Sequence, residues 1–431
     1  MLATHRSPIS RRDLFKLSAA GIAAASVSGW FGSLAAHAEK SGRKHKSCIL
    51  LWMDGGPSHV DTFDPKPEAG AQIHGGWKAI ATSAAGVRIS EKLPQTAKLM
   101  HHAAILRGMS TEEADHGRAR VYMHTGYKPG IGGVTYPGIG STVSAELSET
   151  DFPLPNFVVT GTPLNKYDFV GDPGYRGPLH APLALSEPSK GLENLKPIVP
   201  QDDFDDRANV LEQLEKNFAR TTKSPAAEAH QTTLARTLKL MKSDKAKAFD
   251  LSQEPAAMKQ AYGDHQFGRG CLLARRLIET GVPFVEVYLA NWDGHSKVEA
   301  DRAKALMPVL DIGMSALIGD LKERGLLDST LIIWMGEFGR TPRISPQGGR
   351  DHYARAWSTA LVGGGIKGGQ VIGQTDANAA DVKDRPISVR DFMATVCHAL
   401  GIDGTKKIDT PSGRPIQIVD KGVTPIKEVF G

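Results

Sequence analysis

The sequence predicts a three-layer α/β fold in which a mostly parallel central β-sheet lies between two layers of helices. The first observation is a set of short, largely apolar runs at Cys48–Met53, Phe157–Val159, Pro283–Leu289 and Leu331–Met335. Runs of this kind predict strands that are buried on both faces. The second observation is a helical spacing of leucine and methionine between the last two runs, which stops at Gly325. Strand, helix and strand in succession predict parallel pairing.

A helical insertion is expected at about residues 200–264. This segment is rich in Lys, Glu, Gln and Ala and holds few residues that favour strands. No linker divides the rest of the chain, so we expect one large domain over residues 39–431 that carries the insertion. The three cysteines, Cys48, Cys271 and Cys397, lie in apolar surroundings and predict buried free thiols.

The first 38 residues predict a twin-arginine signal peptide. Arg11 and Arg12 precede a weakly apolar stretch, Leu17–Ala36, and small residues mark a cleavage site before Glu39. Serine and glycine interrupt the stretch, so a permanent membrane span is not expected. We therefore expect the folded chain to be exported by the twin-arginine translocase, and the mature protein to be periplasmic or secreted.

The charge of the chain disfavours one class of partner. Residues 1–38 hold four basic residues and one acidic residue, so the formal net charge of +5 falls to +2 without them. A nearly balanced mature chain lacks the basic footprint of nucleic-acid binding proteins. No nucleic-acid partner is expected.

Acidic residues and histidines follow several of the predicted strands. In open α/β sheets, ligands bind beyond the carboxyl ends of the strands. Carboxylate and imidazole ligands from separate strand ends suit a divalent cation, with one or two ions in the site. Zinc is the predicted ion, with calcium and manganese as alternatives. The predicted metal ligands are Asp54, Asp293, His295, Glu337 and His352.

These residues lie within motifs that resemble a known family. The motifs are Trp52–Lys66, Leu273–Val282, Trp292–His295, Gly336–Pro342 and Gly349–His352. Together they resemble the exported domain-of-unknown-function 1501 family, whose architecture is similar to that of the alkaline phosphatase and sulfatase superfamily. The resemblance implies an alkaline phosphatase-like three-layer sandwich and a metal site that hydrolyses phosphate or sulfate esters.

The superfamily pattern implies how the ligands divide between two metal sites. One site would hold Asp293, His295 and His352. The other would hold Asp54 and Glu337 and would lack one ligand, because Phe338 stands where the superfamily has a histidine. The resemblance leaves His59 and His116 as candidates to complete this second site.

The resemblance also implies a catalytic position. The superfamily places an Asp-Ser pair at the start of a helix that ends in Thr-Gly, and this spacing puts Asp115 and His116 before Thr125-Gly126. The start of a helix favours an anionic phosphoryl or sulfuryl group. His116 could act as nucleophile, general base or metal ligand, with Ser110 and Thr111 as fallback nucleophiles. The formylglycine motif of type I sulfatases is absent from the sequence.

Three arginines lie beside these motifs. Arg118, Arg340 and Arg350 could bind substrate oxygens through paired hydrogen bonds, or could form structural ion pairs with Asp115, Glu337 and Asp351. Arg118 and Arg340 are therefore included with Asp115 and His116 as predicted catalytic residues.

Two functions from different classes follow from the sequence. The first is an exported metal-dependent hydrolase that acts on a small-molecule or glycan ester of phosphoric or sulfuric acid. The alternative is a non-catalytic exported binding protein that keeps the fold. His116 and Phe338, at the nucleophile and ligand positions, favour the alternative, whereas the retained acids and histidines favour the hydrolase. A phosphopentomutase-like isomerase is a weaker third option, because export suits it poorly.

Overall fold

The computed structural model describes residues 46–149, 151–161 and 172–431. The predicted signal peptide, residues 1–38, lies outside the described residues. Among the described residues, no helix has the length and apolar character needed to cross a lipid bilayer. Residues 46–431 cluster into one compact unit.

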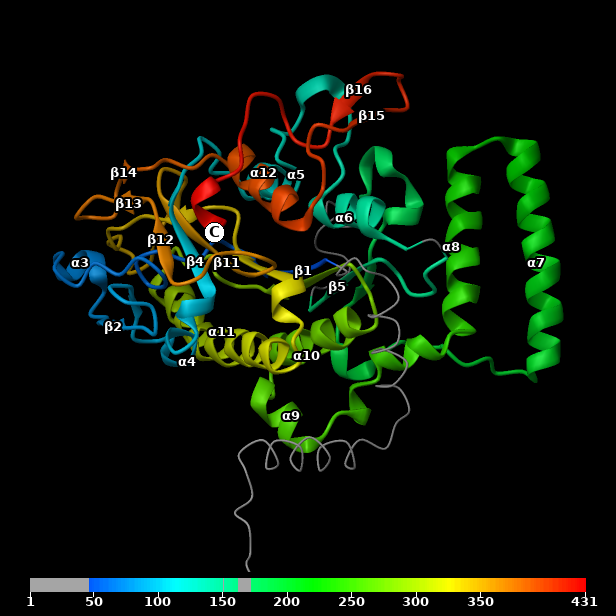
Figure 1. Cartoon of the computed structure of the whole chain (residues 1–431), viewed down its shortest axis with the longest axis horizontal. Helices are drawn as coiled ribbons and strands as arrows, with labels where there is room; N and C mark the ends of the chain where they lie inside the picture. The colour runs from blue at the N-terminus through cyan, green and yellow to red at the C-terminus, as the bar shows by residue number, and fades with distance from the viewer. Residues whose placement is uncertain (1–45, 150, 162–171) are drawn as a thin grey trace, which may run out of the picture. The chain divides into compact units, whose positions relative to one another are not determined.

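An eight-stranded sheet forms the middle layer (Figure 1). Strand β11 runs antiparallel to both of its neighbours, β4 and β8, and the other pairings are parallel. In spatial order the strands are β12 (Gln370–Ile372), β4 (Ala103–Met109), β11 (Trp357–Gly363), β8 (Thr330–Met335), β1 (Ser47–Met53), β7 (Phe284–Leu289), β5 (Phe157–Thr160) and β6 (Leu183–Leu185).

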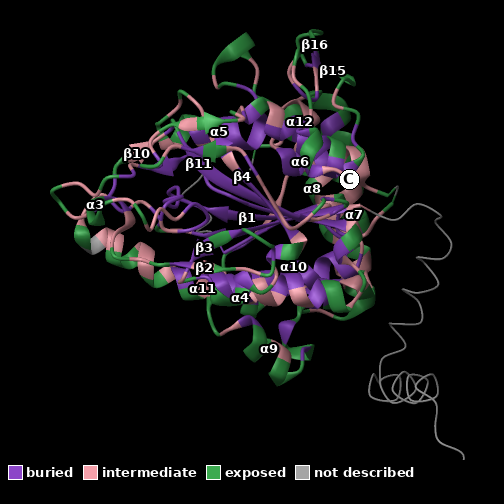
Figure 2. Cartoon of the chain, turned by 60° about the vertical axis from the view of Figure 1, so that its left-hand side comes forward, coloured by how far each residue is buried: buried purple, intermediate pink, exposed green. Residues whose placement is uncertain are grey.

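Two layers of helices cover the sheet, so the predicted three-layer α/β class with a mostly parallel sheet is confirmed (Figure 2). One layer holds α4 (Pro94–Ala97), α10 (Gln266–Glu279) and α11 (Lys297–Glu323), and the other holds α5 (His116–Thr125), α6 (Ile139–Leu147) and α12 (Val389–Leu400). Strand β1 contributes to both cores because its side chains alternate. Ile49, Leu51 and Met53 face the first layer, and Cys48, Leu50 and Trp52 face the second.

Short elements surround the sandwich. Four two-stranded hairpins are β2 (Ala79–Ala81) with β3 (Arg88–Ser90), β9 (Gly339–Arg340) with β10 (His352–Tyr353), β13 (Gln374–Thr375) with β14 (Val382–Asp384), and β15 (Lys407–Asp409) with β16 (Pro415–Gln417). Helix α3 (Ala71–His74) precedes β2. The segment predicted to be a helical insertion contains α7 (Gln201–Thr222), α8 (Pro225–Met241) and α9 (Ala256–Tyr262). Cys48, Cys271 and Cys397 are buried and free.

A buried ion network holds α10 in its layer. Arg275 contacts Glu254, Glu279 and Asp320 at 2.7, 2.7 and 2.9 Å, and it is 1% exposed. Asp320 belongs to α11, so the network joins the two long helices of this layer. A charge removed from water is tolerated only when partners surround it. Within the motif Leu273–Val282, Arg275 therefore has a structural role, because it ties α10 to α11.

Three strands that carry candidate residues lie side by side. Strand β1 pairs with β7 on one side and with β8 on the other, both in parallel register. Asp54, Asp293 and Glu337 follow these strands directly or within a few residues, so the sheet brings the three acids to one edge. Helix α5 lies over the face that contains Trp52 and contributes Tyr122 and Met123 to that core.

Candidate metal centre

Three histidines converge on Asp293. The Nε2 atom of His295 lies 2.9 Å from Oδ1 of Asp293, and Nε2 of His352 lies 3.4 Å from the same oxygen. The Nε2 atom of His116 lies 3.3 Å from Oδ2 of Asp293. The ligand atoms of His116, Asp293 and His352 all lie within 4.8 Å of one another. One carboxylate is thus surrounded by three imidazole nitrogens.

The other ring nitrogen of each histidine is bound to an oxygen. Nδ1 of His116 lies 2.6 Å from Oε1 of Glu337, and Nδ1 of His295 lies 2.8 Å from Oδ1 of Asp351. Nδ1 of His352 lies 2.8 Å from the Ala114 carbonyl oxygen. An ionised carboxylate or a carbonyl oxygen only accepts, so Nδ1 carries the proton in each ring. Each Nε2 is thereby left on the side of Asp293, where it can donate to the carboxylate or to a neighbouring ring when protonated and can bind a cation when it is not.

The donor set fits a divalent cation. Metal-binding histidines usually donate their second N–H to a carboxylate or a carbonyl, as all three rings do here. In a tetrahedral zinc site with bonds of about 2.0–2.1 Å, adjacent ligand atoms lie about 3.3 Å apart. The Nε2 atoms of His295 and His352 are 3.0 Å apart, close to that spacing. Nε2 of His116 is buried and has no hydrogen-bond partner among the described residues.

The local backbone explains why these side chains meet. Asp115 is the N-cap of α5, and its side chain accepts a hydrogen bond from the Arg118 N–H at 3.0 Å, so His116 occupies the first turn. His295 precedes α11, which begins with a capping box formed by Ser296 and Glu299. His352 lies in β10, which pairs with β9. Helix starts and a hairpin fix the three rings.

The charges around His116 alter its protonation. Burial alone would lower the pKa of His116, but the interactions with Asp293 and Glu337 raise it to about 9. The metal-free imidazole is therefore protonated at neutral pH. A cation at Nε2 would have to displace that proton, as is general for metal sites. Burial, the first cause, and the charges of His116 and Arg340 lower the pKa of His352, although its bond to Ala114 opposes them.

Arg340 connects Asp293 to the loop that follows β1. Its guanidinium lies 2.5 Å from Oδ1 of Asp293 and donates to the carbonyl oxygens of Gly55, Gly56 and Arg350, with the last two at 3.0 and 3.2 Å. It is 2% exposed. A buried cation with so many acceptors fixes the loop after β1 against the loop after β7. Arg340 is thus a positioning residue that also adds positive charge to the site.

The other two predicted arginines point elsewhere. The Arg118 side chain is exposed and pairs with Glu113 at 2.9 Å, not with Asp115. Arg350 pairs with Asp61 at 3.0 Å, not with Asp351. Both form ion pairs with acids that the sequence reasoning did not select.

Asp54 and Glu337 lie at the same sheet edge but have protein partners. The Oδ1 atom of Asp54 lies 2.5 Å from Arg120 and accepts from Trp52 Nε1 at 3.2 Å. Glu337, which is fully buried, accepts from the Gly55 N–H at 3.0 Å in addition to His116. His59, the other candidate to complete a second site, binds the Ala379 carbonyl oxygen at 2.9 Å. Arg120 thus already gives Asp54 a cationic partner.

Sequence reasoning missed Arg120 and Glu286. Glu286 is 1% exposed within β7, and its Oε1 lies 3.0 Å from Nε2 of His124. His116, Arg120 and His124 recur every four residues on α5, so they share one face. This spacing is the signal that could have found Arg120. Glu286, an acid inside an apolar run, was a second signal.

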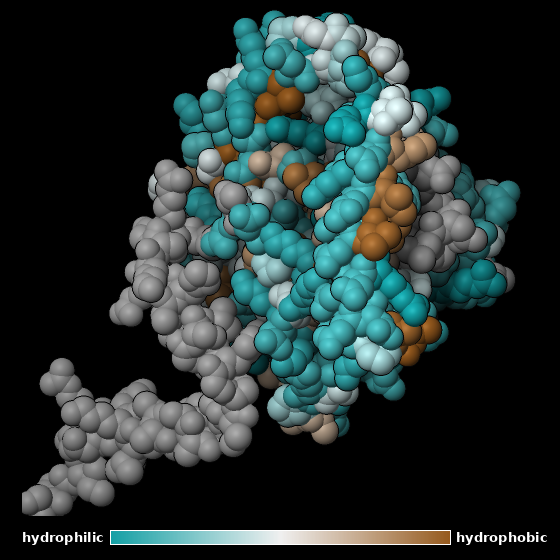
Figure 3. Space-filling model, turned by 90° about the vertical axis from the view of Figure 1, so that its right-hand side faces the viewer, coloured by the Kyte–Doolittle hydropathy of each residue, from teal (hydrophilic) through white to brown (hydrophobic). Residues whose placement is uncertain are grey.

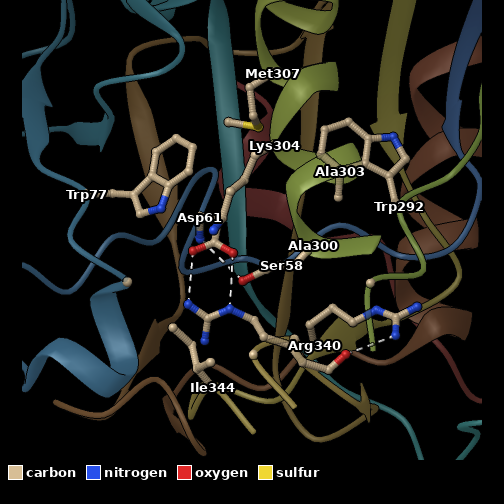
Figure 4. A pocket seen from close by; sticks show the side chains of 15 residues that line it. Ser58, Asp61, Trp77, Trp292, Ala300, Ala303, Lys304, Met307, Arg340 and Ile344 are labelled. Atoms are coloured by element: carbon tan, nitrogen blue, oxygen red, sulfur yellow. Dashed lines mark hydrogen bonds and ion pairs between the residues drawn. The ribbon is translucent and has the colours of Figure 1, made fainter. Parts of the chain in front are cut away.

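One pocket borders the cluster (Figure 4). Trp77, Trp292, Lys304 and Met307 line it together with Arg340 and the Gly349-Arg350 loop. Arg340 therefore faces both the pocket and, through its guanidinium, Asp293.

The family model described as "Protein of unknown function (DUF1501)" matches residues 45–430. The chain belongs to the DUF1501 family. This membership confirms the resemblance inferred from the motifs. No curated protein matches the chain.

The chain is similar to several solved structures. A sulfatase from Pseudoalteromonas sp. is 15% identical, with 86% of this chain and 71% of that chain covered and a TM-score of 0.37. A member of the alkaline phosphatase superfamily from Vibrio parahaemolyticus is 12% identical, with coverages of 84% and 67% and a TM-score of 0.34. A phosphonate monoester hydrolase from Silicibacter pomeroyi is 12% identical, with coverages of 84% and 74% and a TM-score of 0.33.

Proposed function

We propose that this protein is an exported, metal-dependent hydrolase of phosphate or sulfate esters. The observation that supports it most is the convergence of three imidazole Nε2 atoms on Asp293, each ring anchored through Nδ1. Catalytic zinc sites commonly combine histidine nitrogens with a carboxylate oxygen, and each ligating ring donates its second N–H to an oxygen acceptor, as the three rings do here. His116, Asp293, His295 and His352 would hold the ion, and zinc suits this set best.

The protein groups around the ion suit an anionic ester. A divalent cation in this site would polarise an ester oxygen and lower the pKa of a nearby water. Arg340 adds a second positive charge next to Asp293, and the N-terminus of α5 contributes its partial positive charge at His116. These charges would attract a phosphoryl or sulfuryl group, although the N–H groups of Arg340 are themselves bound to Asp293 and to three carbonyl oxygens. Phosphoryl and sulfuryl groups both present tetrahedrally arranged anionic oxygens, so both ester classes are assayed.

Water is the proposed nucleophile. Ser110 and Thr111, the alternative nucleophiles, are held by backbone hydrogen bonds. The Ser110 N–H donates to the Ile387 carbonyl oxygen at 3.1 Å, and the Thr111 N–H donates to the Ala354 carbonyl oxygen at 2.9 Å. The Thr111 hydroxyl accepts from the Glu113 N–H at 3.3 Å, and among the described residues neither hydroxyl forms a hydrogen bond with Asp293 or the three histidines. His116 holds a proton on Nε2 only while no ion is bound there, so in the loaded site it would act as a ligand.

The experiment is metal analysis combined with an ester panel. Purified protein should contain divalent metal and should hydrolyse at least one generic aryl phosphate or aryl sulfate. His352→Gln should lose both properties, because Gln keeps a hydrogen-bonding end but not the imidazole nitrogen. His230→Gln is the matched control, since His230 forms an exposed pair with Glu215 at 2.9 Å on α8. Equal, negligible metal in all three proteins would refute the proposal.

The non-catalytic binding protein remains the second candidate for one reason. Asp54 is paired with Arg120 and Glu337 with His116, so protein cations already satisfy two of the five predicted ligands. Metal at His352 with no turnover on any ester would favour this alternative, which would recognise an anionic glycan or protein through the same site.

Export is tested separately. Translocation of folded proteins depends on the arginine pair, so Arg11→Lys combined with Arg12→Lys should leave folded precursor in the cytoplasm. The distribution of the chain between periplasmic and cytoplasmic fractions measures this. Undiminished periplasmic protein would contradict a twin-arginine route.

A further inference from the structure

Residues 347–350 pack against residues 294–297, the loop that contains His295. Three backbone contacts join the two stretches in antiparallel order. They are the bond from the Lys297 N–H to the Gln347 carbonyl oxygen at 2.9 Å, the bridge between Ser296 and Gly348, and the bond from the Arg350 N–H to the Gly294 carbonyl oxygen at 2.8 Å. Asp351 and His352 follow directly in the sequence. One continuous segment therefore supports one candidate ligand, His295, and supplies another, His352.

Gly349 permits this close approach because it has no Cβ. A Cβ at this position would overlap the carbonyl carbon and oxygen of His295 and the carbonyl oxygen of Gly294. All three atoms belong to the backbone, so no side-chain rotation could relieve the overlap. Carbon atoms that are not bonded normally lie about 3.5–4.0 Å apart. The two stretches could accept a larger residue only by moving apart.

The Arg350 side chain anchors the segment to the rest of the domain. It is 6% exposed and forms a paired contact with Asp61, from Nε to Oδ2 at 3.1 Å and from Nη2 to Oδ1 at 3.0 Å (Figure 4). The same guanidinium donates to the carbonyl oxygens of Ile73 at 2.6 Å, of Thr341 at 3.1 Å, and of Pro342. A lysine ammonium lacks the planar fork that makes such a set of bonds. The main chain of Arg350 thus binds the loop of His295 while its side chain is fixed in place.

The contacts of this segment are internal to the chain. The large apolar side chains that are exposed in the described residues all lie elsewhere. Four of them form a hydrophobic band on α7 (Figure 3), namely Val210, Leu211, Leu214 and Phe218. Residues 347–352 therefore present no large apolar side chain to a partner, and their packing against the loop of His295 is what their contacts explain.

We propose that Gly349 and Arg350 are positioning residues, which hold His295 at the distance from His352 that lets both imidazoles bind one ion. Neither residue would touch the ion, because both act through the backbone of the loop. The Nε2 atoms of the two histidines are 3.0 Å apart. Functional sites need their groups within about 0.5 Å of the productive geometry, and the movement that a methyl group would force at Gly349 is larger. The consequence for metal binding rests on the proposed function, whereas the packing itself does not.

The first test replaces Gly349 and uses zinc as the probe. In Gly349→Ala, the zinc affinity measured by competition with a chelator should fall at least about tenfold. Gly319→Ala is the matched control, because Gly319 lies in α11 and a Cβ there meets nothing within 4 Å. The control should keep the affinity of the wild type. An unchanged affinity in Gly349→Ala, beside a wild type that binds zinc, would overturn the proposal.

The second test separates positioning from stability and does not depend on the folding of Gly349→Ala. Arg350→Lys and Arg275→Lys each remove a buried guanidinium with several partners, so both should lower the melting temperature. Only Arg350→Lys should also weaken zinc binding, by about tenfold, and alter the absorption spectrum of bound Co²⁺, which reports ligand geometry. A loss of stability with zinc affinity and the Co²⁺ spectrum intact would make Arg350 a structural residue only.

The third test needs no metal. In the metal-free wild type, the amides of Lys297 and Arg350 should exchange slowly with deuterated water, because both are hydrogen-bonded across the two stretches. Gly349→Ala should speed their exchange at least about tenfold and leave the amides of β1 unchanged. A wild type without zinc affinity would refute the metal centre but not this packing. Unchanged exchange at both amides in Gly349→Ala would overturn the role of Gly349 whether or not zinc binds.

Discussion

The two ends of α5 carry the same pair of residue types in different surroundings. At its start, His116 binds Glu337, and at its end, His124 binds Glu286. Both glutamates are buried, Glu286 within β7 and Glu337 just after β8. Both nitrogens of His124 are engaged, because Nδ1 lies 2.9 Å from the Arg120 carbonyl oxygen. Nε2 of His116 faces Oδ2 of Asp293 at 3.3 Å, as an ion pair when the ring is protonated, so this is the nitrogen at which a cation could replace the proton.

This difference separates a structural imidazole from one that can bind a ligand. A ring with two engaged nitrogens completes the hydrogen bonding of the core and can accept no further partner. A ring with one engaged nitrogen is oriented for binding through the other. The two glutamates therefore have different effects. Glu286 completes the hydrogen bonding of His124, whereas Glu337 orients the ring of His116 toward Asp293.

The largest contrast is expected from replacing each histidine. His116→Gln should lower metal occupancy and reduce ester hydrolysis by at least about 100-fold, and it should also cost about 1–3 kcal/mol of stability, because Glu337 is a buried acid too. His124→Gln should keep metal and activity but cost about 1–3 kcal/mol of stability, because it disturbs the bond to a buried acid. Metal analysis and denaturant unfolding of both variants measure the contrast. Equal loss of metal in both would remove the distinction between the two ends.

The glutamates should show the same contrast with smaller effects. Glu337→Gln keeps the shape of the side chain but weakens the hold on His116, so metal affinity should fall about 10–100-fold. Glu286→Gln makes the matching change at the other end and should leave metal affinity unaltered. Competition with a chelator measures both affinities. An unchanged affinity in Glu337→Gln would show that this acid does not support the site.

The ion pair of Asp54 with Arg120 provides a third comparison, because Arg120 lies in the middle of α5. Arg120 lies midway between the two histidines and holds Asp54 at 2.5 Å. Asp54→Asn should keep the metal content per molecule and should cost about 1–3 kcal/mol, because it weakens a buried charged hydrogen bond. Elemental analysis decides the point. Loss of one equivalent of metal would instead make Asp54 a ligand, as the sequence predicts, and would establish a second ion.

The smallest effect is expected at Asp351. Its side chain is 62% exposed, although it anchors His295 in the way that Glu337 anchors His116. Water competes for an exposed carboxylate, so Asp351→Asn should weaken metal binding by less than about tenfold. The chelator assay used for Glu337→Gln provides the direct comparison. A larger loss here than at Glu337 would contradict the idea that burial strengthens the anchor.

The fold was predictable because buried strands and helices have characteristic patterns of apolar residues within short stretches of sequence. The apolar run Cys48–Met53 corresponds to β1 within one residue, and α11 ends two residues before Gly325. The antiparallel strand β11 was not predicted. Its direction depends on its pairing with β4 and β8, and a strand buried in this way has the same side-chain pattern in either direction.

The candidate site was predictable only in outline. The rule for strand ends brought Asp54, Asp293 and Glu337 to one edge of the sheet. The rule could not show which of these acids pair with a cationic side chain, because that depends on where α5 packs against this edge of the sheet. Helix α5 delivers Arg120 to Asp54 and His116 to Glu337, and these are contacts between residues more than sixty positions apart.

The order of the site residues along the chain also sets when a metal can be acquired. Strands β5, β6 and β7 and helices α7 and α8 lie between His116 and Asp293 in the sequence. His352 follows later still, in β10. A growing chain therefore cannot assemble this centre while most of it is still on the ribosome. If the centre binds a metal as proposed, uptake follows completion of the fold, since ligands so far apart meet only then. For a chain exported after folding, the ion that fills the centre would be set by the metal pool of the cytoplasm.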